Sequence, residues 1–406
     1  MPVPWRSSLQ ARLTDRDMED WEHGGFGLYL HWPFCEAKCP YCDFNSHVTR
    51  EVDEDRWGRA FEAEIARVAA RTGPRHLTSI FFGGGTPSLM SADLVNRVLG
   101  AARRAWDVPT DAEVTLEANP RSAEADKFRG FADAGVNRLS MGLQALNDAD
   151  LRRLGRLHSV AEARVAFDAG RDVFDRVSFD LIYARQGQDE AAWRAELTEA
   201  LSMAVDHLSL YQLTIEPGTA FFERARRGQL KALPDEDRAA DLYEVTQEIC
   251  DAAGRPAYEV SNHAVPGGES RHNLVYWRGG DYAGIGPGAH GRLTVNGQRR
   301  AISQWRNPGA WLDRAEAGNA DRIDEALSPQ DHVGEYLMMG LRVLDGVDLA
   351  RVETICPGAI TAEAVHPLEE IGMLERSNGR LRTTRAGRLV LNSVVAELLP
   401  ELDTAS

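Results

Sequence analysis

The sequence predicts an α/β fold built around a partial, TIM-like (β/α)6 barrel, followed by an α+β extension and a small C-terminal module. From about residue 27 to residue 213, strand-length apolar segments alternate with segments whose apolar residues recur at helical spacing. Residues 77–82 form an apolar run, as expected for a strand covered on both faces of a parallel sheet. Six β/α units are fewer than the eight that close a full barrel, so an open barrel is expected.

The predicted strands are spread evenly along the first half of the chain. They cover residues 27–32, 77–82, 113–118, 138–144, 177–183 and 207–213. Between them, apolar residues such as Trp57, Phe61 and Ile65 recur at helical spacing. Ser91 precedes a second segment whose apolar residues recur at helical spacing, and serine is a preferred residue at a helix N-cap.

The second half of the chain has a different pattern. A helix is predicted over residues 238–253 and a hairpin at residues 377–380, inside a helical unit that is typical of a winged-helix-like module. Residues 331–406 contain 7 Arg and no Lys against 12 Asp and Glu, so a structural or protein-docking role is favoured over DNA binding. Four regions are expected: an N-terminal extension, the barrel, the α+β extension and the C-terminal module, at residues 1–26, 27–228, 229–325 and 326–406.

The composition excludes several classes of protein. The hydrophobic and charged fractions, 43% and 27%, are those of an ordinary soluble protein. No run of about 18 apolar residues is present, so no transmembrane helix is predicted, although peripheral membrane contact stays open. The net charge of -16 opposes nucleic-acid binding. The acidic N-terminus has no secretory signal and the chain is poor in cysteine, so a cytoplasmic location is expected.

Three of the five cysteines follow the first predicted strand. Cys35, Cys39 and Cys42 are separated by gaps of three and two residues, so their thiolates can converge on one metal centre. Three thiolates do not complete a tetrahedral structural zinc site, whereas they suit a cubane iron–sulfur cluster with one open iron. Zinc with His31 or His47 as the fourth ligand remains an alternative.

Polar residues follow the ends of the later strands, where the active site of a parallel α/β barrel lies. The second strand ends in a glycine-rich turn, residues 83–87, whose backbone can approach a ligand closely. Glu117 and Gln144 end the next two strands, and Arg156 could hold a carboxylate through both arms of its guanidinium. Asp180 lies in an apolar strand, so it is expected to face the site. For the glycine-rich turn, the alternative is a tight turn that binds no ligand. For Arg156, the alternative is a solvated arginine at the end of a helix.

The cysteine spacing resembles that of the radical S-adenosylmethionine (SAM) superfamily, in which the open iron binds SAM. A longer resemblance, from about residue 27 to the C-terminus, is to the HemN/HemW family, which includes an anaerobic coproporphyrinogen III dehydrogenase and a heme chaperone. It is carried by residues 29–35, 83–87, 117–120, 137–144 and 211–219. The resemblance implies a [4Fe-4S] cluster on the three cysteines, and SAM contacts at Tyr29, Tyr41, Gly84, Gly85, Thr86, Glu117, Gln144, Arg156 and Asp180.

Two features favour the chaperone pattern within this family. The dehydrogenase has another cysteine two residues after the third cluster cysteine, where this sequence has Phe44. His272, Asn273, Tyr276 and Trp277 match a His-Asn-x-x-Tyr-Trp stretch that the family associates with heme binding. Such a histidine could ligate heme iron while the aromatic rings cover the porphyrin. On the residues alone, a loop packed by aromatic side chains is the favoured alternative.

The resemblance therefore implies a heme chaperone that binds a [4Fe-4S] cluster, SAM and heme, and passes heme to an acceptor protein. The alternative within the family is oxidative decarboxylation of coproporphyrinogen III, and a structural zinc protein is a third interpretation. The sequence departs from the family after the fifth strand. The family commonly has Gly-Leu-Pro-Gly-Gln there, whereas residues 184–188 are Ala-Arg-Gln-Gly-Gln, which puts the charge of Arg185 near the expected barrel mouth.

Overall fold

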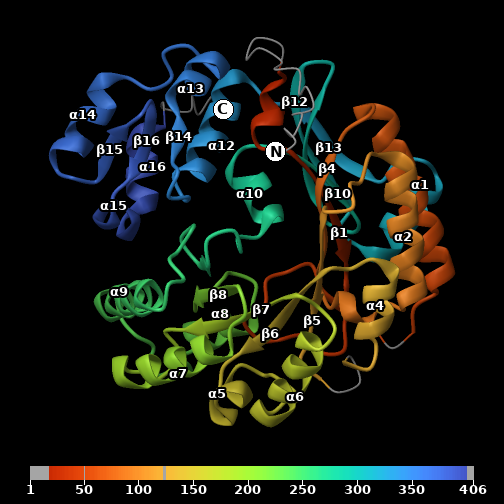
Figure 1. Ribbon diagram of the computed structural model, residues 1–406, viewed down its shortest axis with the longest axis horizontal. Coiled ribbons are helices and arrows are strands. Elements are labelled where there is room, and N and C mark those ends of the chain that lie inside the picture. Colours follow the sequence, from red (N-terminus) through yellow and green to blue (C-terminus); the bar gives the residue numbers. More distant parts are fainter. Residues whose placement is uncertain (1–17, 50, 122–124, 400–406) are drawn as a thin grey trace, which may run out of the picture.

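An eleven-stranded sheet forms the centre of the computed structural model (Figure 1). The structure describes residues 18–49, 51–121 and 125–399, so most of the expected N-terminal extension lies outside the described residues. The strand order is β13-β12-β11-β10-β1-β4-β5-β6-β7-β8-β9. The sheet begins and ends in different strands, which confirms that the barrel is open.

Six parallel strands of this sheet confirm the predicted alternation. They are β1 (Phe26–Trp32), β4 (Leu77–Gly84), β5 (Glu113–Ala118), β6 (Arg138–Gln144), β7 (Arg176–Tyr183) and β8 (His207–Gln212). A seventh, β10 (Asp281–Ile285), pairs in parallel with the outer edge of β1 and was not predicted. It is short and lies in a glycine-rich stretch, which gives no clear strand pattern.

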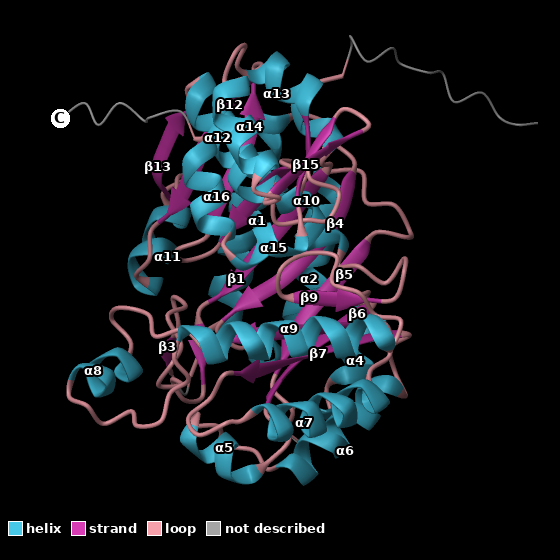
Figure 2. Cartoon of the chain, turned by 90° about the vertical axis from the view of Figure 1, so that its left-hand side faces the viewer, coloured by secondary structure: helices cyan, strands magenta, loops and turns pink. Residues whose placement is uncertain are grey.

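Helices cover the outer face of the barrel (Figures 1 and 2). They are α1 (Glu54–Thr72), α2 (Ala92–Ala105), α4 (Phe128–Ala134), α5 (Asp148–Arg153), α6 (Val160–Arg171) and α7 (Glu190–Met203). Ser91 caps α2 as predicted, because its side chain accepts a hydrogen bond from the Leu94 amide. The predicted residues Trp57, Phe61 and Ile65 are buried on the inner face of α1.

Antiparallel strands extend the sheet at both edges. β9 (Asn262–Ala264) pairs with β8. On the other side, β11 (His290–Val295), β12 (Gln298–Gln304) and β13 (Asp321–Ala326) continue from β10, and α11 (Pro308–Glu316) follows β12. Trp311 of α11 stacks on Trp57 with ring centroids 5.3 Å apart, so this extension shares the core of the barrel.

The C-terminal module has its own hydrophobic core. Three helices, α8 (Ala220–Arg226), α9 (Glu236–Ala252) and α10 (Arg271–Trp277), lie between β8 and β10 in the sequence. The module contains α12 (Pro329–Gly340), β14 (Val347–Asp348), α13 (Leu349–Ile355), α14 (Ala362–Glu370), β15 (Leu374–Ser377), β16 (Arg380–Thr383), α15 (Arg385–Leu389) and α16 (Leu391–Leu398). The predicted hairpin is present, and its two turn residues, Asn378 and Gly379, both have positive φ. Among the residues that the structure describes, no helix is both long and apolar enough to cross a membrane.

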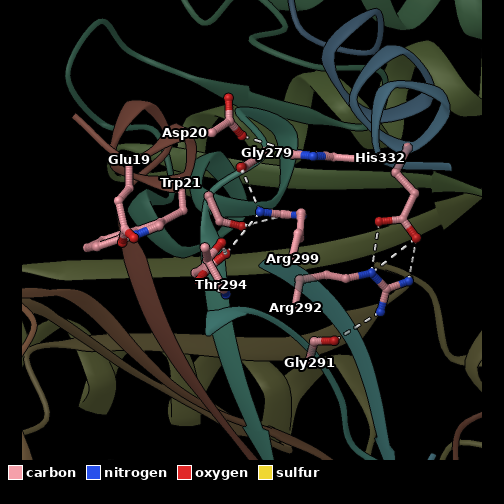
Figure 3. Close-up of polar contacts among 12 residues, drawn as sticks. Glu19, Asp20, Trp21, Gly279, Gly291, Arg292, Thr294, Arg299 and His332 are labelled. Carbon is pink, nitrogen blue, oxygen red and sulfur yellow. Dashed lines mark hydrogen bonds and ion pairs between the residues drawn. The ribbon is translucent and has the colours of Figure 1, made fainter. Parts of the chain in front are cut away.

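A buried ionic network joins β10 to distant parts of the chain. Asp281 is fully buried and accepts hydrogen bonds from Arg75 at 2.6 Å and from Arg299 at 2.9 Å. Nearby, Asp20 of η1 (Asp20–His23) pairs with Arg351 of the C-terminal module, at 2.7 Å, and with His332. Figure 3 shows Arg299 and Asp20 in this group. Burial opposes ionisation of Asp20, but its bonds to Arg351 and His332 hold its pKa below the usual range.

Replacing Asp281 tests whether this network stabilises the fold. We expect Asp281→Asn to lower the free energy of unfolding by about 3–5 kcal/mol, because two buried arginines would lose their counter-charge. Asp313→Asn is the matched control, since Asp313 pairs with Arg56 at 2.9 Å but its side chain is 74% exposed. The control should change stability by less than about 1 kcal/mol. Equal effects in a urea unfolding titration would contradict the expectation.

Candidate functional site

A cavity of about 630 Å³ opens at the C-terminal ends of the parallel strands. One wall is the cysteine loop, residues 35–46, and the other consists of the ends of β4, β5, β6, β7 and β8. The active site of a parallel α/β barrel lies at this end. The cavity is therefore the candidate functional site.

The cysteine loop is fixed at both of its ends. At its base, β2 (Phe34–Cys35) pairs in parallel with β3 (His47–Val48). On its other side, the Asn45 side-chain amide donates hydrogen bonds to the carbonyl oxygens of Pro287 and Arg306, each at 2.8 Å. These contacts tie the loop to the chain that follows β10 and β12, so its position depends on the sheet extension.

The three predicted ligands, Cys35, Cys39 and Cys42, all line the cavity. Thr86 Oγ1 donates to Cys35 Sγ at 3.4 Å, and Arg156 Nη1 donates to Cys39 Sγ at 3.5 Å. Burial raises the pKa of Cys35 and Cys42, and negative charge on the neighbouring thiolates raises it further. Thiolates that repel one another in a part-buried site are stabilised by a cationic centre, so this donor set fits an iron–sulfur cluster.

The geometry gives no support to a single zinc ion. In residues 18–49, 51–121 and 125–399, no group of three or more His, Cys, Asp or Glu side chains is placed to hold one metal ion. His31 uses both ring nitrogens, one with the Tyr29 hydroxyl and one with the backbone oxygen of Asn45, each at 2.9 Å. The ligands of a cubane cluster attach to different irons, so the thiols need not meet at one point.

Eight of the nine predicted SAM contacts line the cavity, and Tyr29 does not. The eight are Tyr41, Gly84, Gly85, Thr86, Glu117, Gln144, Arg156 and Asp180. Tyr29 instead bonds to His31 and lies beside Phe81 and His272, deeper in the barrel. Its position in the sequence, before a cysteine motif, gave no indication of which face of β1 it would occupy.

The glycine-rich turn brings two backbones together. The Gly85 amide donates to the carbonyl oxygen of Trp32 at 2.7 Å, and the Thr86 amide donates to that of Phe34 at 2.8 Å. A Cβ atom on Gly85 would lie only 2.6 Å from the Phe34 oxygen, so a larger residue cannot occupy this position unchanged. The close approach observed here is therefore between β4 and the cysteine loop.

Two carboxylates and one guanidinium form the polar floor of the cavity. Gln144 Nε2 donates to Asp180 at 2.6 Å, from a residue whose φ of 70° is unusual outside glycine. Burial raises the pKa of Asp180 to about 6, and burial beside Asp180 raises that of Glu117 to about 8. Arg156 is held by Asn119 and by the Gly142 carbonyl oxygen, both at 2.8 Å, so the alternative of a solvated arginine is wrong. This floor suits a ligand that carries both positive charge and a carboxylate.

The structure places His272 away from this cavity. Its ring nitrogens hydrogen-bond to the Ser79 hydroxyl at 2.8 Å and the Tyr276 hydroxyl at 2.6 Å, and burial lowers its pKa to about 3. Ser79 and Glu113, which accepts from the His272 amide, lie near the N-terminal ends of β4 and β5. Helix α10 therefore packs against the opposite end of the barrel from the cysteines. Both nitrogens are engaged, so iron ligation by His272 requires one of these two bonds to break.

The other heme-motif residues also lie on or beside α10. The side-chain amide of Asn273 donates to the Tyr258 hydroxyl at 3.3 Å. Tyr276 packs edge-on against Tyr282 with ring centroids 4.5 Å apart. The indole nitrogen of Trp277 is buried and has no hydrogen-bond partner among the described residues. Tyr276 therefore takes part in aromatic packing, the arrangement weighed from the sequence as the alternative to heme binding.

Arg185 turns away from the cavity, contrary to the expectation of a charge at the barrel mouth. It is buried and pairs with Glu196 and, at 3.0 Å, with Asp150. Its Nη1 also donates to the Ile182 carbonyl oxygen at 2.5 Å. The charge is therefore neutralised between α5 and α7. Ala184 has a φ of 56°, a conformation that favours the glycine common in the family.

Several cavity residues were not singled out from the sequence. Ser46, Ser209, Tyr211 and Ser261 line the cavity, and the Ser209 hydroxyl donates to Asn262 at 2.6 Å. They come from three separate segments, and small hydroxyl side chains carry no spacing signal. Ser209 and Tyr211 lie within the predicted strand 207–213, and Tyr211 also begins the resembling residues 211–219, so this segment alone pointed toward that side of the cavity.

Comparisons with known proteins agree with this architecture. Residues 29–198 match the Radical SAM superfamily, and residues 327–390 match the HemN C-terminal domain. The chain is 40% identical over 390 residues to the Bos taurus "Radical S-adenosyl methionine domain-containing protein 1, mitochondrial", covering 93% of this chain and 88% of that protein. It is 36% identical over 381 residues to "Heme chaperone HemW" of Escherichia coli, covering 92% and 98%.

The fold is also that of a solved structure. Escherichia coli coproporphyrinogen III oxidase (HemN), titled a radical SAM enzyme, matches with a TM-score of 0.78 at 23% identity, covering 93% of this chain and 91% of that one. At this identity the likeness shows the fold alone. The sequence identities to the curated relatives, which extend over nearly the whole chain, decide the family. The chain belongs to the HemN/HemW family of radical SAM proteins.

Proposed function

We propose that this protein is a heme chaperone that binds a [4Fe-4S] cluster, SAM and heme, and passes heme to an acceptor protein. The family implies the cluster and SAM. The observation that carries the chaperone assignment is the 36% identity to a heme chaperone over nearly the full length of both chains. The cavity supports it with three thiols in one loop facing the ends of five strands.

Within the cavity, the chain's own residues would hold and orient the two cofactors. The cluster, when bound, supplies one-electron chemistry. Arg156 lies next to Cys39 and can receive the carboxylate of SAM, while Glu117 and Asp180 can accept hydrogen bonds from its hydroxyl and ammonium groups.

Phe44 favours the chaperone over the decarboxylating enzyme. It stands where the dehydrogenase has its additional cysteine, and the residue is 59% exposed and lines the cavity. Phenylalanine has no thiol group, so at this position it can neither donate a thiol proton nor ligate a metal. The HemN-like fold keeps decarboxylation of coproporphyrinogen III as the second candidate.

The cluster assignment can be tested by removing single cysteines. Anaerobically reconstituted protein should contain about four irons per chain, the stoichiometry of one [4Fe-4S] cluster. Cys35→Ala should lose the iron and the cluster absorbance. Cys250→Ala is the control, because Cys250 is buried in α9 and does not line the cavity. Equal loss of iron in a folded Cys250→Ala protein would refute the assignment.

The SAM site can be tested at Arg156. We expect Arg156→Ala to weaken SAM binding by about 1.5–3 kcal/mol, the range for a hydrogen bond to a charged group. Arg153→Ala is the matched control, because Arg153 is 60% exposed and pairs with Asp150 on α5. Calorimetric titration with the cluster in place should show a normal affinity for the control. An unchanged affinity in Arg156→Ala would remove this residue from the site.

The choice between chaperone and enzyme has a direct test. The reconstituted protein should bind heme stoichiometrically and, when supplied with SAM, a one-electron reductant and an electron acceptor, should not convert coproporphyrinogen III. Cys39→Ala provides the background rate for the conversion assay. Formation of protoporphyrinogen above that background would establish the enzyme in place of the chaperone.

The same heme titration examines His272. If His272 ligates the iron, as the family resemblance implies, His272→Ala will shift the Soret band or weaken binding. Tyr276→Phe keeps the aromatic packing and frees one ring nitrogen of His272, so it should strengthen binding instead. A Soret band unchanged in both variants would assign the axial ligand elsewhere.

A further inference from the structure

The backbone at Gln144 is strained, and its side chain lines the cavity. Its φ of 70° lies in the left-handed region, which residues other than glycine keep only when the surrounding structure holds them there. The residue is 7% exposed, and its Nε2 donates to Asp180 at 2.6 Å. Its Oε1 has no hydrogen-bond partner among the described protein atoms. This oxygen is therefore a buried acceptor that an N–H or O–H group of a ligand would satisfy.

Two hydrogen bonds hold the chain around this strained residue. The Ala145 amide donates to the carbonyl oxygen of Leu143 at 3.0 Å, which is the pattern of a γ-turn centred on Gln144. A γ-turn with positive φ is rare and strained. One residue later, the Leu146 amide donates to Oε1 of Glu196 at 2.7 Å, and Glu196 is a buried residue of α7. A side chain from another element therefore anchors the exit of the turn.

The Glu196 carboxylate is itself fixed by two donors. Arg185 Nη2 donates to its Oε2, and Gln188 Nε2 donates to the same oxygen at 3.2 Å. Arg185 also pairs with Asp150, in the first turn of α5, at 3.0 Å. Charged groups buried together in this way keep their positions, because moving one of them leaves another without its counter-charge. Glu196 can therefore serve as a rigid support for the Leu146 amide.

We propose that Glu196 is a positioning residue of the SAM site and acts through Gln144. Its carboxylate holds the strained turn at residues 143–146, and the turn points the unpartnered oxygen of Gln144 toward the ligand. The inference rests on the proposed function, because it takes SAM as the ligand of the cavity. Glu196 does not line the cavity, so it affects the ligand only through the segment that it holds. Without this support the turn would relax toward an unstrained φ, and the Gln144 side chain would lose its orientation.

The test is a double-mutant cycle, measured by calorimetric titration of SAM into the protein with its cluster in place. Glu196→Ala should weaken SAM binding about tenfold, a loss typical of a residue that orients a binding side chain. In the Gln144→Ala background the same replacement should have little further effect, because the oxygen that Glu196 positions is already absent. Glu199→Ala is the matched control, since Glu199 also belongs to α7 but is 42% exposed and pairs with Arg164.

A second variant keeps the test decisive if Glu196→Ala does not fold. Glu196→Gln has nearly the same size, but its amide group would place a donor against either the Leu146 amide or Arg185. It should weaken SAM binding in the same direction by a smaller factor, and the cycle can be repeated with it.

The outcomes separate this inference from the proposed function. Wild-type SAM affinity in a folded Glu196→Ala or Glu196→Gln protein would overturn the inference. An equal loss with and without Gln144, or the same loss in Glu199→Ala, would show a general loosening of the fold and would overturn it as well. Failure of the reconstituted wild-type chain to bind SAM would instead overturn the proposed function.

Discussion

The close contact between the end of β4 and the cysteine loop is the constraint on which the site depends. Backbone hydrogen bonds from Gly85 and Thr86 to the segment before Cys35 fix both walls of the cavity at once. Only a glycine lets these two backbones approach this closely, since a Cβ atom would meet the Phe34 oxygen. The same contact places the Thr86 hydroxyl against the Cys35 sulfur, so loop position and ligand environment are set together.

The barrel separates two regions that the family resemblance had brought together under one function. The cysteines and the polar floor occupy the C-terminal ends of the strands, whereas α10 and His272 pack at the N-terminal ends. Heme on α10 and the cluster would thus share a barrel without sharing a cavity. Between these two ends, the interior of the strands carries polar side chains such as Arg138 and Ser178, hydrogen-bonded at 2.9 Å.

Much of this arrangement could be predicted from the sequence, because the strands and the cysteine motif depend on local pattern. Strands β5 and β6 begin and end at the predicted residues, and eight of the nine residues expected to contact SAM line one cavity. Contacts between residues far apart in the sequence could not be predicted from these local patterns. The sequence around Arg185 shows a departure from the family, but not the partners on α5 and α7 that bury it. No sequence pattern marks Ser46 as a residue of the cavity, because only the folded cysteine loop brings it there.

The pairing of β1 with β10 has a consequence for how the chain is made. Leu30 of the first strand meets Ile285, a residue that leaves the ribosome 255 positions later. Until then, one edge of β1 has no native partner, and an unpaired edge strand invites association with other chains. Contacts of such long sequence separation also slow folding. The edge of β1 that pairs with β10 therefore stays without its native partner during most of the synthesis of this chain.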